Sequence, residues 1–105
     1  MTEHEFKHAM GAAKTFSEIS DQYFWTGYIR GLRRNYHEKF GTDAEHELWM
    51  SAASSDDETR RMRGIGYQCG FNGNNIQITL KTLSEERMQV NDLKIRTKMS
   101  CNGKG

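Results

Sequence analysis

The sequence lacks long hydrophobic runs and is poor in apolar residues generally. Its 105 residues are 35% hydrophobic, and no run approaches the roughly 18 consecutive apolar residues that span a bilayer. Membrane insertion is therefore not expected. The chain is nonetheless too rich in aromatic residues for a disordered protein, with five Phe, four Tyr and two Trp. The length predicts a single domain with a thin core.

Cysteine is scarce and the net charge is small. Cys69 and Cys101 lie far apart, and neither belongs to a C-x-x-C pair. Because no hydrophobic signal segment opens the sequence, we expect free thiols in a cytoplasmic protein. The formal charge of +1 argues against a polyanion binder that uses its whole surface. Any electrostatic function must come from charges that are segregated on the surface.

Helix-capping signatures and helical spacing predict a mainly α fold. Capping boxes begin at Thr2 and Thr42, each followed three residues later by Glu. We expect helices over 2–17, 22–39, 43–52 and 57–71, with Leu48, Trp49 and Ala52 as the packing face of the third. Residues 76–80 alternate apolar and polar side chains, as in a short strand, whereas 83–95 favour a helix. The prediction is one bundle of four to five helices over 1–96 and a flexible tail over 97–105.

The stretch from Asp21 to Tyr36 is the most strongly patterned part of the chain. Phe24, Tyr28 and Leu32 recur at helical spacing beside Gly27 and Gly31. The sequence Gly-Tyr-x-x-Gly then returns 39 residues later at positions 66 to 70. A glycine inside a helix costs about 1 kcal/mol relative to alanine. The two glycine pairs therefore predict a close crossing of the second and fourth helices.

The start of the chain contains a motif typical of zinc peptidases. Residues 4–8 read His-Glu-Phe-Lys-His, and H-E-x-x-H on a helix can bind zinc with the glutamate as general base. The extended motif needs a histidine at position 14, where this chain has Lys14. We expect two surface histidines instead, with no metal, no cofactor and no catalytic residue. Cys69 follows Tyr67 on an apolar stripe and is expected to fill the core.

Basic and aromatic residues on the second and fourth helices form the first candidate binding face. Tyr23 shares this character, and aromatic side chains of this kind stack on bases or anchor protein interfaces. The candidate residues are Trp25, Arg30, Arg33, Arg34, Tyr36, Arg60, Arg61 and Arg63.

Two acidic clusters form a second candidate face: Asp43, Glu45, Glu47, Asp56, Asp57 and Glu58. In one interpretation these acids cap their helices and pair with the arginines. In the other, the charges separate and the protein is bipolar. A separated acidic face could mimic phosphates, and a separated basic face could bind nucleic acid or an acidic protein.

Residues 20–71 resemble small proteins of bacteriophages and mobile elements. The resemblance rests on Tyr28–His37, on Phe40-Gly41-Thr42, on Glu45–Met50 and on Arg63-Gly64-x-Gly66-Tyr67-x-x-Gly70. Such proteins are often binders directed at the host, including anti-CRISPR and anti-restriction inhibitors. The resemblance thus implies a non-enzymatic protein that binds and inhibits a host protein or nucleoprotein complex. A nucleic-acid-binding module is the second hypothesis, and a small zinc metallopeptidase is a remote third.

Overall fold

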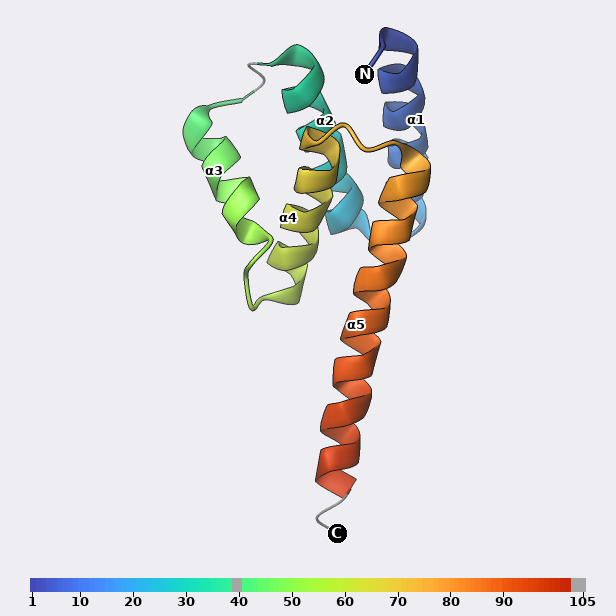
Figure 1. Ribbon diagram of the computed structural model, residues 1–105, viewed down its shortest axis with the longest axis vertical. Coiled ribbons are helices and arrows are strands. Elements are labelled where there is room, and N and C mark those ends of the chain that lie inside the picture. Colours follow the sequence, from blue (N-terminus) through green and yellow to red (C-terminus); the bar gives the residue numbers. More distant parts are fainter. Residues whose placement is uncertain (39–40, 103–105) are drawn as a thin grey trace.

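The computed structural model describes the backbone of residues 1–38 and 41–102, and the side chains of 1–38 and 41–89. Within these residues the chain forms five α-helices and no strand (Figure 1). The predicted mainly α fold, a small helical bundle, is confirmed. The helices are α1 (Glu3–Ile19), α2 (Gln22–His37), α3 (Asp43–Ala52), α4 (Glu58–Phe71) and α5 (Ile76–Asn102).

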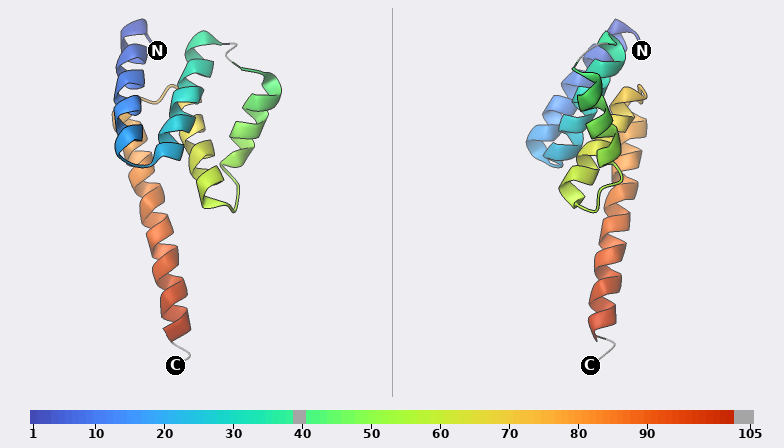
Figure 2. Two further views of the ribbon diagram at one scale, coloured as in Figure 1. Left: turned by 180° about the vertical axis from the view of Figure 1, so that it is seen from behind. Right: turned by 90° about the vertical axis from the view of Figure 1, so that its left-hand side faces the viewer.

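The bundle is arranged around a central pair of helices, α2 and α4. The helices α1 and α3 flank this pair on opposite sides (Figures 1 and 2). The last helix, α5, packs against α1 and α4 and then continues past the body. Its length explains the elongated outline of 57 × 28 × 20 Å. Within the part of the chain that the structure describes, no helix is both long and apolar enough to cross a membrane.

Side-chain caps mark the starts of α1, α3 and α4. The hydroxyls of Thr2 and Thr42 each accept a hydrogen bond from the backbone N–H three residues later, at 3.1 Å. The Asp57 carboxylate caps α4 in the same way. Each bond satisfies a backbone donor that the helix itself leaves unpaired. These local interactions explain why α1, α3 and α4 start within one residue of the predicted positions.

The predicted close crossing of α2 and α4 is confirmed, and it is reciprocal. A Cβ atom added at Gly27 would overlap the carbonyl oxygen of Arg63, and one added at Gly66 would overlap that of Phe24. Gly31 lies in the same way against the Tyr67 carbonyl, and Gly70 against that of Tyr28. Position numbers rise together along both helices, so α2 and α4 run parallel. We call Gly27, Gly31, Gly66 and Gly70 the glycine seam.

The predicted apolar stripe of α2 forms the centre of the core. Phe24, Tyr28 and Leu32 are fully buried. The Tyr28 hydroxyl donates a 2.6 Å hydrogen bond to the Asn74 carbonyl in the turn before α5. Leu83, at 3% exposure, brings α5 into the same core. The core therefore joins the central pair to both α1 and α5.

The sequence left a strand or a helix open near the end of the chain. The strand considered for 76–80 is wrong, because these residues begin α5. Asn75 starts the helix there, since its side-chain oxygen accepts from the Ile78 N–H at 2.9 Å. The helix also extends beyond the expected 83–95 and includes 97–102 of the predicted tail. Residues 103–105 of that tail lie outside the described residues.

Candidate functional site

Trp25 is not part of a contact face, which corrects the sequence prediction. Its exposure is only 1%. The indole packs against Phe16 of α1 at 5.0 Å between ring centroids and meets the edges of Phe24 and Tyr28. Trp25 lies beside the stripe of Phe24 and Tyr28 on α2, and α1 covers this side of the helix. This residue belongs to the core and cannot reach a partner.

Tyr36 is tied to the first helix. Its ring stacks on Phe6 of α1 with centroids 4.3 Å apart and an interplanar angle of 10°. The side chain is half-buried by this contact. Tyr36 therefore helps to hold α1 against α2. Figure 2 shows that α1 lies on the side of the central pair opposite α3.

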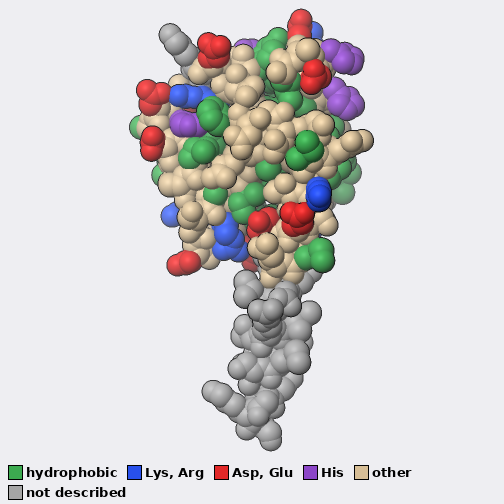
Figure 3. All heavy atoms as spheres, in the orientation of Figure 1, with side chains coloured by type: hydrophobic (Ala, Val, Ile, Leu, Met, Phe, Trp, Pro, Cys, Tyr) green, Lys and Arg blue, Asp and Glu red, His purple; other side chains and the backbone are tan. Residues whose placement is uncertain are grey.

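The arginines of α2 are engaged by the acidic start of α3. Arg30 forms an ion pair with Glu45, and Arg34 pairs with Asp43 at 2.7 Å. Arg33 also takes part in interactions and is half-buried. The interpretation in which the acids pair with the arginines therefore holds for these two pairs. On the face drawn in Figure 3, acidic and basic side chains lie interspersed over the body.

The other acidic residues cap helices or lie exposed. Asp57 is the N-cap of α4, as described above. Glu47, Asp56 and Glu58 are exposed. Arg61 of α4 donates a hydrogen bond to the Ser55 carbonyl at 3.1 Å and thereby fastens the loop before this helix. The residues of the predicted second face therefore cap a helix, pair with arginines or lie exposed to solvent.

Arg63 is the most unusual of the predicted basic residues. Its guanidinium carbon lies 5.4 Å from the ring centroids of both Tyr23 on α2 and Trp49 on α3. Arg30 lies over the same Trp49 ring at 5.7 Å. Stacked guanidinium and aromatic groups of this kind attract one another through the ring quadrupole. The structure thus brings predicted arginines from α2 and α4 together around an aromatic residue of α3.

A groove of about 380 Å³ opens beside this stack. We call it the Trp49 groove; it is lined by Glu45, Leu48, Trp49, Ala52, Arg60 and Arg63. Leu48 is 68% exposed and Trp49 is half-buried, whereas Ala52 is buried. The expected packing face of α3 is therefore wrong for Leu48. Helical spacing alone could not show that Leu48 is exposed. It marks the apolar residues of α3 but not which of them α4 covers.

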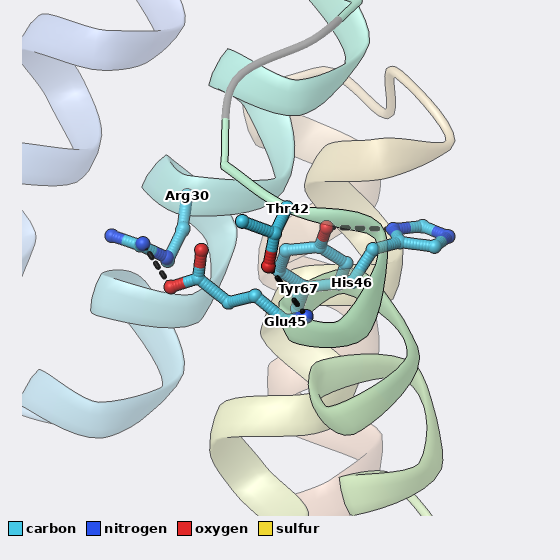
Figure 4. A network of polar contacts seen from close by, with 5 residues as sticks. All are labelled: Arg30, Thr42, Glu45, His46 and Tyr67. Carbon is cyan, nitrogen blue, oxygen red and sulfur yellow. Dashed lines mark hydrogen bonds and ion pairs between the residues drawn. The ribbon is translucent and has the colours of Figure 1, made fainter.

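The back of Trp49 is supported by a polar network between α3 and α4. Trp49 stacks on Tyr67 with centroids 5.5 Å apart, and the Tyr67 hydroxyl lies 2.7 Å from Nδ1 of His46 (Figure 4). Burial raises the pKa of Tyr67, and the nearby Arg34 opposes that rise. The sequence gives no sign of this contact, because His46 lies between Glu45 and Glu47, a setting typical of a solvated residue. The contact fixes the orientation of the ring on which Trp49 rests.

The zinc motif has a structural role at the start of α1. Glu5 belongs to the capping box, in which its carboxylate accepts from the Thr2 hydroxyl at 3.0 Å. His4 and His8 are exposed. No group of three potential metal ligands occurs among the residues that the structure describes. Cys69 is buried, and burial raises the pKa of its thiol, which disfavours the reactive thiolate.

A second hollow of about 310 Å³ lies between α1, α2 and α5. It is lined mainly by apolar side chains, among them Phe16, Ile19 and Leu83. Arg87 at its edge forms an ion pair with Asp21, so the charged group there already has a partner. The Trp49 groove is therefore the stronger candidate for a binding site. No family model, curated protein or solved structure matches this chain.

Proposed function

We propose that this chain is a non-enzymatic protein that binds a partner protein through the Trp49 groove. The observation that carries the proposal is the exposed Leu48 beside the half-buried Trp49, whose ring is contacted by Arg30 and Arg63. Tryptophan and arginine are the residue types that dominate the energy of protein interfaces. The aromatic stack holds them in place before any partner arrives, which lowers the entropic cost of binding.

The resemblance to phage and mobile-element proteins supports a host target. In this proposal the partner is a host protein or nucleoprotein complex, and binding inhibits it, as anti-CRISPR and anti-restriction proteins do. A small rigid bundle suits this role because it can occlude a surface without performing chemistry. The groove lies on α3 and α4, within the region that carries the resemblance.

Nucleic-acid binding is the second candidate, and the arginine-aromatic stack favours it. Bases stack readily on exposed aromatic rings, and arginine contacts phosphates. The pairing of Arg30 and Arg34 with α3 acids reduces the positive charge on this side of the molecule. Binding of a labelled oligonucleotide that weakens steeply with salt, and is lost in Arg33→Glu, would favour this candidate over the first.

The proposal is tested with matched surface variants. Leu48→Asp places a charge in the groove, and Met88→Asp places one at a similarly exposed apolar residue of α5; their wild-type exposures are 68% and 67%. We expect the wild type and Met88→Asp, but not Leu48→Asp, to capture the same bacterial protein from lysate. Capture that is equal for all three chains would refute the groove as the binding site.

A cellular assay then tests inhibition. The chain is expressed in bacteria with active CRISPR or restriction defence, and plaque formation by a targeted phage is counted. We expect the wild type and Met88→Asp to restore plaques against one of these defences, and Leu48→Asp to fail. Plaque numbers that do not change with any chain contradict the inhibitor role, while leaving the capture result to be judged separately.

A further inference from the structure

Arg63 lines the groove, and one donor of its guanidinium has no acceptor. Its Nε atom is buried and has no hydrogen-bond partner. Among the residues that the structure describes, no carboxylate forms an ion pair with Arg63. A buried donor of a charged group that goes unsatisfied is costly, and native structures contain few of them. The Tyr23 and Trp49 rings cover the faces of the guanidinium but accept no strong hydrogen bond in its plane.

The groove beside Arg63 combines a basic wall with an apolar floor. Arg60 lies one helical turn before Arg63 and is exposed. Leu48, Trp49 and Ala52 provide the apolar surface. Glu45 is the acidic residue of the lining, and its carboxylate is already paired with Arg30. The unmatched charge of the groove is therefore positive and is concentrated on α4.

We propose that the Trp49 groove binds an acidic and apolar segment of the partner protein. A carboxylate of that segment accepts hydrogen bonds from Arg63 and Arg60, and a neighbouring aliphatic side chain packs on Leu48 and Trp49. This inference rests on the proposed function and specifies the chemistry of its partner. Arginine suits the role because its planar fork binds both oxygens of one carboxylate.

The surroundings of the groove favour a single carboxylate over a row of phosphates. Glu47 on α3 is exposed, and exposed acids also occupy the start of α4 and the loop before it. A nucleic-acid strand carries a charge at every nucleotide and would bring phosphates close to these acids. A peptide can present one carboxylate to the arginines and neutral residues elsewhere. Like-charge contacts of this kind exclude wrong partners.

The test uses a defined peptide. An eight-residue peptide with one Glu among alternating Leu and Ser residues, called the Leu-Glu peptide and blocked at both ends, is titrated into the full chain labelled with ¹⁵N. The Trp49 indole N–H and the Arg63 Nε–H resonances report on the groove. A peptide with Gln in place of Glu is the charge control, and a short oligo-dT is the nucleic-acid control. The variants are Arg63→Gln and, as a remote control with an exposed charge, Lys81→Gln.

We expect the Leu-Glu peptide to shift both resonances at saturation. The Gln peptide should bind about ten-fold more weakly, as should Arg63→Gln toward the Leu-Glu peptide; that ratio corresponds to about 1.4 kcal/mol. Lys81→Gln should bind like the wild type. No shift with the Leu-Glu peptide, or equal binding of the Gln peptide, overturns the inference. Displacement of the peptide by oligo-dT assigns the groove to nucleic acid and overturns it too.

Competition in lysate separates this inference from the proposed function. If Leu48→Asp abolishes capture of a host protein but the Leu-Glu peptide never competes with that protein, the groove binds a partner of other chemistry. The proposed function then stands and the acidic segment is refuted. If the wild type captures nothing that depends on Leu48, the proposed function itself fails.

Discussion

At the scale of single residues, the glycine seam is the most demanding feature of the chain. Each of its four glycines faces a backbone carbonyl of the other helix, at a distance that leaves no room for a methyl group. Backbone atoms cannot move aside as a flexible side chain can. A substitution at the seam must therefore push the two helices apart along their whole contact.

Gly66→Ala is accordingly predicted to lower the free energy of unfolding by about 3 kcal/mol or more, because its Cβ would overlap the Phe24 carbonyl. Gly11→Ala is the matched control, since nothing lies within 4 Å of an added Cβ there. It should stabilise the chain by about 0.5–1 kcal/mol through helix propensity. Urea denaturation measures both values. A loss below about 1 kcal/mol for Gly66→Ala would show that the helices are not in such close contact.

Tyr28 is predicted to make stability fall at high pH. Burial raises the pKa of Tyr28 to about 12, against the opposing effect of a hydrogen bond with Thr79. Unfolded tyrosine titrates near 10. Below about pH 10 the phenol keeps its proton in both states, so the contribution to stability is complete. As the pH rises from about 10 to 12, the unfolded chain ionises first and the free energy of unfolding decreases.

Urea denaturation at neutral pH and at about pH 11 checks this prediction. Tyr28→Phe should reduce the alkaline loss while costing about 1 kcal/mol at neutral pH for the hydrogen bond to Asn74. Part of the loss should remain because burial also raises the pKa of Tyr67. An equal alkaline loss in wild type and Tyr28→Phe would contradict the assignment.

Sequence reasoning at this scale succeeded where spacing determines the outcome. Two glycine pairs at the same interval predicted the α2–α4 contact because no other role offsets their cost within helices. The same reasoning failed for Trp25, since its place on α2 shows which stripe it occupies but not which helix covers that stripe. Burial of Trp25 depends on Phe16, a residue of another helix.

At the scale of elements, α5 contacts the bundle through few of the side chains that the structure describes over 76–89. Leu83 is almost fully buried, whereas Ile78, Leu80 and Met88 are exposed at 51%, 39% and 67%. The Asn75 cap and the Tyr28 hydrogen bond to Asn74 fix the point where α5 begins. Leu83 is the one large apolar side chain over 76–89 that is almost fully buried, beside the smaller buried Thr79, so docking of this helix should depend strongly on it.

Leu83→Ala is predicted to cost about 2–5 kcal/mol, as expected for a large-to-small change in a core. It should also lower hydrogen-exchange protection over 76–89 more than in α2 and α4. Met88→Ala is the control and should change stability by less than about 0.5 kcal/mol. Protection over 76–89 that is unchanged in Leu83→Ala would mean that α5 is held by other contacts.

The beginning of α5 shows why a local pattern can mislead. Residues 76–80 alternate in polarity, which also satisfies the period of a strand, and five residues are too few to distinguish the two periods. The deciding residue was Asn75, an effective N-cap that the prediction treated only as part of a helix stop. Capping chemistry was a better guide than alternation at this position.

At the scale of the whole molecule, the glycine seam joins two helical hairpins, α1–α2 and α3–α4, into one body. Trp25 lies where the first hairpin meets the core, and Trp49 lies on the second. Because α2 and α4 contact each other more extensively than any other pair, separation of one hairpin should expose the core of the other.

We therefore predict one cooperative unfolding transition for both hairpins. In Trp49→Phe the fluorescence of Trp25 should change with the same urea midpoint as circular dichroism, and in Trp25→Phe the fluorescence of Trp49 should do so too. Each comparison is made within one variant, so the stability cost of the substitution cancels. An earlier midpoint for Trp49 would show that the α3–α4 hairpin unfolds independently.

The Trp49 groove illustrates the limit of sequence reasoning at this scale. Arg60 and Arg63 were predicted as binding residues, but their relation to Leu48 and Trp49 depends on how α3 is placed beside α4. The stack that includes Tyr23 and Arg30 also requires the α2–α4 register. Composition could indicate basic and aromatic character, whereas the groove exists only after three helices have assembled.

The reciprocity of the glycine seam also bears on how such a protein can change over time. Its contacts join backbone to backbone, so they specify almost nothing about the side chains that point outward. A lineage can replace nearly its whole surface and keep the same architecture, provided that two pairs of glycines stay four residues apart and 39 residues from one another. Sequences related to this chain would then share the interval between the glycines even where the residues around them have diverged.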